Sequence, residues 1–250
     1  MKVFITGGTS GIGLALAQRY LERGYQVGIC GRNIEKIGKI DKNDNLSIYK
    51  LDVYDKDYFG KIVNDFSKGK LDIMIAMAGS YANNRNSSYK EKEVTEMLKT
   101  NIVGTVNALE IAREIMLKNK KGHIVVMSSV AALLDYDGAS IYAKSKRVVM
   151  ELGKAYGEAL SNFGIDVTTI ISGYVDTLKL KELNNNDTSH KLFIISEEEA
   201  VEKILNAIDN KKKEIIFPIK MKILMVFLSK LPKFLLKRIL MWKNKKQDIN

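Results

Sequence analysis

The sequence is poor in several residue types, and each shortage excludes a class of protein. Its one cysteine, Cys30, permits no internal disulfide and is expected to be a small apolar residue in an early strand. The two histidines, His123 and His190, have no partner at metal-ligand spacing, so we expect surface residues and no metal site. No run of eighteen uncharged apolar residues exists, which argues against a membrane-spanning helix. Lys2 is followed at once by a short strand, so no secretory signal is expected and a cytoplasmic location is favoured.

What is present is an alternation of strand-like and helix-like segments. The 250 residues are 46% hydrophobic, enough for one large α/β core. Strands are predicted near 2–6, 26–30, 46–51, 71–77, 122–128, 165–171 and 214–217. Helices are predicted near 11–23, 55–68, 91–118, 140–163 and 197–209. This order predicts an α/β fold of the Rossmann type, a doubly wound parallel sheet with helices on both faces. One catalytic domain is expected over 1–217, followed by a helical tail over 218–250.

A glycine-rich turn joins the first predicted strand to the first predicted helix. Gly7 permits a tight turn, Gly11 lets the backbone approach a pyrophosphate, and Gly13 lets the helix pack on the strand. The free N–H groups and partial positive charge of the helix N-terminus favour an anion there. The turn is therefore predicted to bind a dinucleotide, through Thr6, Gly7, Thr9, Ser10, Gly11, Ile12 and Gly13.

A serine, a tyrosine and a lysine follow at spacings that suit carbonyl reduction. Tyr142 and Lys146 are four residues apart and share one face of a helix. The Lys146 ammonium can stabilise the Tyr142 phenolate, so we expect the pKa of Tyr142 to be lowered. A phenol tuned in this way can give a proton to a forming alkoxide. Ser129, at the end of a predicted strand, can hydrogen-bond the same carbonyl oxygen.

Together these motifs resemble the compact branch of the short-chain dehydrogenase/reductase family over residues 1–217. The matching pieces, in order, are Thr6-Gly7-x-x-x-Gly11-x-Gly13, Leu51-Asp52-Val53, Ala78-Gly79, Asn101, Ser129, Tyr142-x-x-x-Lys146 and Gly173-x-Val175-x-Thr177.

The resemblance implies roles for residues that the spacing alone does not explain. Asp52 and Val53 would flank the adenine, whereas Ala78, Gly79, Gly173, Val175 and Thr177 would also belong to the cofactor site. Lys146 would hold the nicotinamide ribose as well as prime Tyr142. Asn101 would hold a water that links Lys146 to solvent. Family members are commonly homodimers or homotetramers built on the two long helices, here 91–118 and 140–163.

The end of the second strand indicates which cofactor is preferred. An acid there favours NAD(H), whereas an arginine accommodates the 2′-phosphate of NADP(H). This chain has Arg32 at the junction and no acid, although its glycine-rich loop carries no Lys or Arg. We therefore expect NADP(H), with NAD(H) open as the alternative.

Two departures from the family pattern concern cofactor packing. The usual Asn-Asn-Ala-Gly is Ala76-Met77-Ala78-Gly79, so hydrogen bonds from both asparagines must be replaced or absent. The usual Pro-Gly is Ser172-Gly173, which loosens a rigid turn. Neither change affects the serine, tyrosine and lysine.

The predicted reaction is reduction of a ketone or aldehyde by NADPH, with Tyr142 as proton donor. A polar stretch within 178–195 indicates a lid over the substrate, and its apolar flanks favour a lipophilic ketone such as a 3-oxo-acyl lipid. A dehydrogenase of small, soluble alcohols or ketones linked to NAD stays open. So does a nucleotide-sensing relative without catalysis, against which the complete set of four catalytic residues counts.

The segment 218–250 carries a net charge of +8, out of +11 for the whole chain. Its lysines alternate with apolar runs too short to span a bilayer, and Pro232 is expected to divide it into two short helices. This pattern is typical of a helix on an anionic membrane surface, here the inner face of a membrane. Packing on the protein body or on a second subunit is the alternative. The apolar content argues against nucleic acid.

Overall fold

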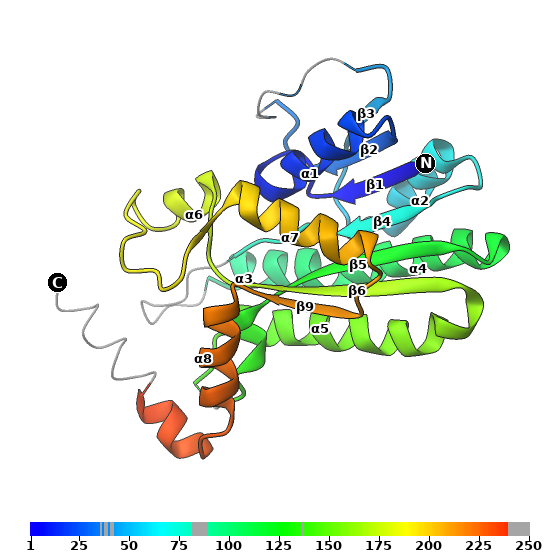
Figure 1. Ribbon diagram of the computed structural model, residues 1–250. Coiled ribbons are helices and arrows are strands. Elements are labelled where there is room, and N and C mark those ends of the chain that lie inside the picture. Colours follow the sequence, from blue (N-terminus) through cyan, green and yellow to red (C-terminus); the bar gives the residue numbers. More distant parts are fainter. Residues whose placement is uncertain (36, 38–39, 41–42, 82–89, 137, 240–250) are drawn as a thin grey trace.

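The computed structural model describes the chain except for residues 36, 38–39, 41–42, 82–89, 137 and 240–250. Its centre is a seven-stranded sheet in the order β3-β2-β1-β4-β5-β6-β9, in which every neighbouring pair is parallel (Figure 1). The strands are β1 (Lys2–Thr6), β2 (Gln26–Gly31), β3 (Leu46–Lys50), β4 (Ile73–Ala76), β5 (Gly122–Ser129), β6 (Ile165–Ser172) and β9 (Glu214–Phe217). A separate parallel pair joins β7 (Val175–Asp176) to β8 (Ile195–Ser196). The predicted Rossmann-type fold is confirmed.

Helices cover both faces of the sheet, as the order of elements predicts. They are α1 (Gly11–Glu22), α2 (Lys56–Ser67), α3 (Glu91–Leu98), α4 (Gly104–Asn119), α5 (Ile141–Leu160), α6 (Leu178–Glu182), α7 (Glu197–Asp209) and α8 (Ile219–Ser229). Side chains of α1 and α7 pack on one face, and those of α2, α4 and α5 pack on the other.

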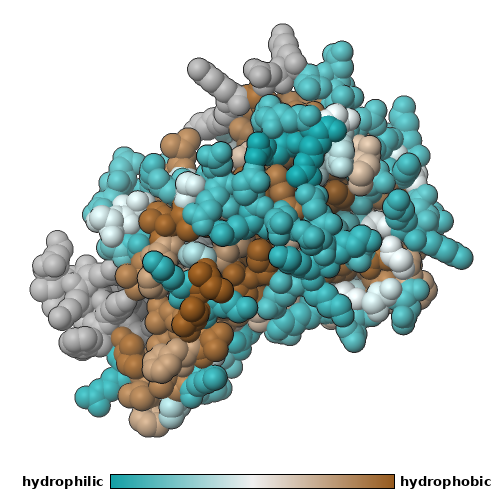
Figure 2. Space-filling model, in the orientation of Figure 1, coloured by the Kyte–Doolittle hydropathy of each residue, from teal (hydrophilic) through white to brown (hydrophobic). Residues whose placement is uncertain are grey.

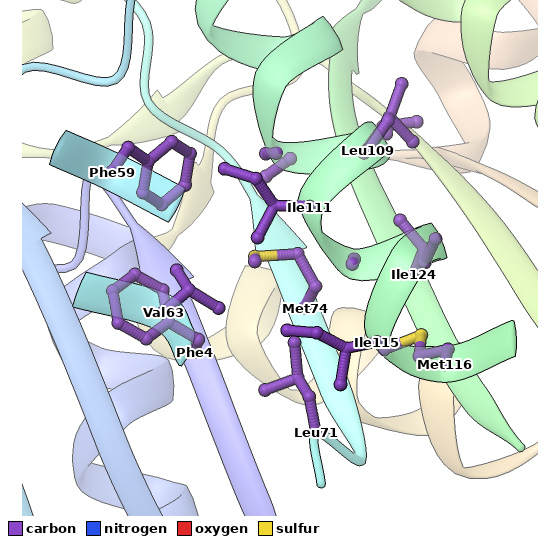
Figure 3. Packing of buried hydrophobic residues seen from close by; sticks show 14 of the residues in the cluster. Phe4, Phe59, Val63, Leu71, Met74, Leu109, Ile111, Ile115, Met116 and Ile124 are labelled. Atoms are coloured by element: carbon purple, nitrogen blue, oxygen red, sulfur yellow. The ribbon is translucent and has the colours of Figure 1, made fainter. Parts of the chain in front are cut away.

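The two cores follow from the alternation of side chains along each strand. In β1, Val3 and Ile5 point toward α1 and α7, whereas Phe4 points to the opposite face. There Phe4 meets Phe59 of α2 and Met74 of β4 (Figure 3). Because both faces are covered, the central strands are apolar throughout, as in other parallel sheets.

The long helix predicted over 91–118 is interrupted in the structure. Between α3 and α4 the chain forms a π-helical turn over Lys99–Val103, with Asn101 fully buried inside it. Such a turn adds a residue to the helical repeat and is frequent at functional sites. The spacing of apolar residues does not reveal it.

The prediction that His123 lies at the surface is wrong. His123 begins β5 and is buried, with its Nε2 2.7 Å from Thr168 Oγ1. The Thr168 hydroxyl donates to the Lys212 carbonyl oxygen, so it accepts from His123, and Nε2 carries the proton. Burial lowers the pKa of His123. His190 is exposed, as expected. No group of three metal-ligating side chains occurs among the described residues.

The tail forms two helical segments separated by Pro232, as predicted: α8 and residues 233–239. One side of α8 packs on the body through Met221, Leu224 and Met225. In the second segment Leu236 is buried. The part of the tail from 240 onward, with its Trp242, lies outside the described residues. Within the described chain, no helix is both long and apolar enough to cross a membrane.

Candidate active site

The turn between β1 and α1 requires its glycines. Gly7 and Gly11 have φ angles of +69° and +50°, in the left-handed region that glycine adopts without steric cost. A Cβ on Gly7 would lie 2.9 Å from Ala78 Cα, and a Cβ on Gly13 would lie 2.4 Å from the Gly7 carbonyl oxygen. Larger residues at 7 and 13 would therefore separate α1 and the end of β4 from the turn.

The N-terminus of α1 faces out of this turn. Its N-cap residue, Ser10, is extended, and the Ser10 hydroxyl forms no capping hydrogen bond with the first turn in the part of the chain that the structure describes. Uncapped N–H groups and the helix dipole make a site for an anion. Thr177 Cγ2 lies 3.7 Å from where a Cβ on Gly11 would be, so the segment after β6 meets the same turn.

Thr6 braces the edge of the sheet at which the two asparagines of the family pattern are missing. Its Oγ1 accepts hydrogen bonds from the backbone N–H groups of Met77 and Ala78, each at 3.1 Å. The Thr6 side chain thereby holds the end of β4 against β1. Although both asparagines are absent, the end of β4 is still held, by Thr6 of the neighbouring strand β1.

The ends of β2 and β3 form the far part of the same edge. Gly31 leaves room for the Thr9 side chain, because a Cβ on residue 31 would lie 2.4 Å from Thr9 Oγ1. Arg32 follows and is exposed. Asp52 Oδ1 is buried and has no hydrogen-bond partner among the described residues, so it can accept from a ligand donor. Val53 packs against Gly104, where a Cβ would lie 2.2 Å from Val53 Cγ2.

Ser129, Tyr142 and Lys146 meet where β5 ends and α5 begins. The side chains of Ser129 and Tyr142 share a hydrogen bond. Lys146 is buried, and its Nζ donates to the Met127 carbonyl oxygen at 3.0 Å. Ser128 Oγ donates to the Lys146 carbonyl oxygen at 2.7 Å, which ties α5 to β5. The strand and the helix together thus position all three side chains.

The expected lowering of the pKa of Tyr142 is wrong for the structure, which shows the opposite direction. Burial raises the pKa of Tyr142 to about 12, and the hydrogen bond with Ser129 opposes this only in part. Burial, with a smaller effect of the Lys179 ammonium, lowers the pKa of Lys146 to about 8. The four-residue spacing correctly places the two groups on one helix face, but it contains no information on desolvation.

Asn101 holds the loop that follows β4. Its Oδ1 accepts from Ser80 N at 2.8 Å, and its Nδ2 donates to Ser80 O and Ser145 Oγ, each at 3.1 Å. A Cβ on Gly79 would lie 3.3 Å from Lys146 Nζ and 3.5 Å from Asn101 Oδ1, so both groups adjoin Gly79. The proton relay that the resemblance implies for Asn101 stays a prediction.

A cavity of about 490 Å³ opens in front of these residues. Ser129, Tyr142 and Lys146 line it together with several of the predicted cofactor residues. The latter are Ile12, Gly79, Gly173, Val175 and Thr177. The remaining predicted cofactor residues do not line the cavity: the turn carries Thr6, Gly7, Thr9, Ser10, Gly11 and Gly13, and the edge beyond carries Arg32, Asp52, Val53 and Ala78. The sheet edge thus joins the glycine-rich turn to the Ser-Tyr-Lys group.

Comparison with known proteins agrees with this geometry. Residues 1–188 match the family described as short chain dehydrogenase. The chain belongs to the short-chain dehydrogenase/reductase family. An uncharacterized oxidoreductase of Staphylococcus aureus (strain MW2) is 29% identical over 188 residues, which is 73% of this chain and 81% of the relative. An uncharacterized oxidoreductase of Staphylococcus epidermidis is 27% identical over 179 residues, 69% of this chain and 77% of the relative.

Solved structures of family members have the same fold. ElxO with NADP bound superimposes with a TM-score of 0.75 at 27% identity, covering 86% of this chain and 95% of that one. A short chain dehydrogenase from Burkholderia cenocepacia J2315 in complex with NADP gives a TM-score of 0.79 at 17% identity, covering 96% and 97%.

Several lining residues of this short-chain dehydrogenase/reductase were missed by sequence reasoning. Tyr81 packs edge-on against Tyr142, with ring centroids 5.0 Å apart. Met221 and Met225 of α8 line the cavity, so the tail helix contributes to the pocket. Lys179, on α6 in the segment predicted to be a lid, also lines it. The apolar residues of the tail could have indicated the two methionines. If the tail packs on the protein body, as the alternative in the sequence analysis has it, such residues can reach the pocket.

Proposed function

We propose that this oxidoreductase reduces a lipophilic ketone to an alcohol, with NADP(H) as cofactor. The observation that carries the proposal is the convergence of Ser129, Tyr142 and Lys146 on one cavity, which Ile12 at the start of α1 also lines. NADPH, when bound, supplies the hydride that reaches the carbonyl carbon.

The side chains of the chain supply the remaining parts of the mechanism. The Tyr142 hydroxyl is the proton donor to the forming alkoxide oxygen, because a phenol with a raised pKa holds its proton until that base forms. The Ser129 hydroxyl orients the same oxygen. The Lys146 ammonium stabilises the phenolate that remains and holds the nicotinamide ribose. Asn101 fixes the Ser80 backbone beside them.

The residues present fit a bound dinucleotide. Gly7 and Gly13 keep the turn tight, since a Cβ at either position would meet protein backbone, and the buried acceptor Asp52 Oδ1 would receive a donor from the adenine. Arg32 at the end of β2, where no acid stands, favours a 2′-phosphate and therefore NADP(H) over NAD(H). Titration with NADPH and NADH, followed by cofactor fluorescence, tests this preference. Tighter binding of NADH would contradict it.

The lining of the cavity supports an apolar substrate. Leu134, Leu180 and Leu183 line it from the body and the lid, and Met221 and Met225 line it from α8. A ketone with an acyl chain would bury that chain against these residues, at about 0.8 kcal/mol per methylene. NADPH consumption with ketones of increasing chain length tests the substrate class. Rising kcat/KM supports it, whereas activity confined to short ketones favours the small-ketone alternative, and binding without turnover favours a nucleotide sensor.

The outer side of α8 supports contact with a membrane surface. Ile219, Ile223, Val226 and Phe227 are exposed at helical spacing, on the side away from the packed methionines. Figure 2 shows hydrophobic residues gathered over this helix. The exposed lysines of the tail, Lys220, Lys222, Lys230, Lys233 and Lys237, suit anionic headgroups. The inner side of the helix would thus line the pocket while the outer side lies on lipid.

The Ile223→Glu and Phe227→Glu double variant tests this contact. We expect its binding to vesicles of anionic phospholipid to fall about tenfold, because two carboxylates replace buried apolar area at a negative surface. Phe163→Glu is the matched control, since Phe163 is also exposed but lies at the amino end of β6. Equal vesicle binding by the wild type and the double variant would contradict membrane contact.

The assembly we propose is a homodimer or homotetramer that uses α4 and α5. Val103, directly before α4, and Val148, within α5, are exposed apolar residues. Light scattering of the purified chain tests this, and a monomer at micromolar concentration would contradict it.

A further inference from the structure

Lys179 connects the lid to the far side of the active site. It lies on α6, and its Nζ donates to the Gly79 carbonyl oxygen at 2.7 Å, across a hundred residues of sequence. Gly79 lies three residues after the end of β4 and adjoins Lys146 Nζ. This hydrogen bond therefore places a lysine of the lid across the edge of the sheet.

The neighbours of Lys179 define the stretch that it spans. Two residues before it, Thr177 adjoins Gly11 at the N-terminus of α1. On its other side is Gly79, where a Cβ would lie 3.3 Å from Lys146 Nζ. A dinucleotide that runs from the glycine-rich turn to Lys146 would therefore come close to the Lys179 side chain.

The charges around Lys179 favour an anion at this place. Burial and the Arg32 guanidinium lower the pKa of Lys179, and Lys179 in turn lowers the pKa of Lys146. Glu182 is the acid that acts in the opposite direction. The electrostatic repulsion among three cations along one edge is relieved when phosphate groups lie between them. Phosphate binding at this edge is therefore favourable.

We propose that Lys179 binds the diphosphate bridge of the dinucleotide and thereby closes the lid over it. On binding, its ammonium exchanges the neutral Gly79 carbonyl for a charged phosphate oxygen, which is the stronger partner. Arg32 would serve the 2′-phosphate and Lys146 the nicotinamide ribose, so the diphosphate falls to the lysine between them. This inference rests on the proposed binding of NADP(H), and it adds a residue that the glycine-rich turn, without Lys or Arg, does not supply.

Titration of the Lys179→Met variant with cofactor fragments tests the assignment. We expect the Kd for NADPH and for ADP-ribose to rise about tenfold, because one charge-assisted hydrogen bond is lost. The Kd for adenosine 2′-monophosphate, which lacks the diphosphate, is expected to stay within about twofold of the wild type. Arg32→Met should show the reverse pattern: weaker binding of adenosine 2′-monophosphate and unchanged binding of ADP-ribose.

Lys144→Met is the matched control for net charge. Lys144 is exposed on α5, two residues from both Tyr142 and Lys146. An equal loss of NADPH affinity in this variant and in Lys179→Met would overturn the proposal, since general attraction would then explain it. Unchanged affinity of Lys179→Met for NADPH and ADP-ribose would also overturn it. These measurements need no turnover, so a wild type that binds NADPH without reducing a ketone would refute only the proposed reaction.

Hydrogen exchange of the lid gives an independent readout. In the wild type, NADPH is expected to slow amide exchange in peptides that cover 178–195, because Lys179 holds α6 against the cofactor. In Lys179→Met this slowing should be lost even at saturating NADPH. Equal protection of the lid in both proteins would contradict the closing role.

Discussion

Binding of NADPH is expected to make the protein take up protons. The pKa of Lys146 is lowered to about 8, mainly by burial and further by the Lys179 ammonium. Negative charge placed beside a lysine favours its charged form, so the phosphates of the cofactor raise this pKa. The pKa of Lys179 is lowered as well and moves in the same direction on binding. Binding of NADPH is therefore expected to add protons at both Lys146 and Lys179.

The size of the uptake follows from the pKa of Lys146. A group with a pKa of about 8 is about half protonated at pH 8 and about nine-tenths protonated at pH 7. If binding makes Lys146 fully charged, it takes up about 0.5 proton at pH 8 and about 0.1 at pH 7. Lys179 adds to both values.

Calorimetry measures this uptake directly. The binding enthalpy of NADPH is determined at pH 7 and pH 8 in buffers that differ in ionisation enthalpy, and the slope gives the number of protons. The second pKa of a phosphate monoester is near 6, so the cofactor contributes little at pH 8 and about 0.1 proton at pH 7. Lys146→Met should remove about half a proton of uptake at pH 8. Zero uptake or net release by the wild type at pH 8 would refute the reasoning.

Two further predictions concern stability, measured by urea unfolding. Asn107→Ala is expected to lower the free energy of unfolding by about 1–3 kcal/mol. The reason is that the Asn107 amide is buried and donates to two backbone carbonyls between β3 and α2. A difference below about 0.5 kcal/mol would contradict this. Gly153→Ala is expected to cost about 1–3 kcal/mol, since its Cβ would lie 2.2 Å from Thr169 Oγ1. Gly157→Ala, one turn along the same helix, would meet only Val167 at 3.6 Å and should be neutral or stabilising; equal losses in the two glycine variants would exclude overpacking as the cause.

The sheet and its flanking helices followed from local patterns. Strand–turn–helix with glycines at 7, 11 and 13 determines the start of the fold, and parallel strands bring their carboxyl ends to one edge. The start of α7 shows how local such chemistry is, since the N-cap hydroxyl of Ser196 accepts from Glu199 N at 3.0 Å, three residues along the chain.

Features that depend on contacts distant in sequence were not predictable. The burial of His123 depends on Thr168 and on the backbone at Lys212, which the pattern around His123 does not contain. The hydrogen bond between Lys179 and Gly79 joins residues a hundred positions apart. The raised pKa of Tyr142 likewise reflects burial, which a helical spacing cannot report.

The central claim is that Tyr142 gives the proton to the reduced carbonyl. Measurement of kcat with NADPH and a long-chain ketone, for the wild type and Tyr142→Phe, tests it most directly. We predict a fall of about 10²- to 10⁴-fold, the range for loss of a general acid, with the Kd for NADPH within about twofold of the wild type. A kcat for Tyr142→Phe within about threefold of the wild type would contradict the account.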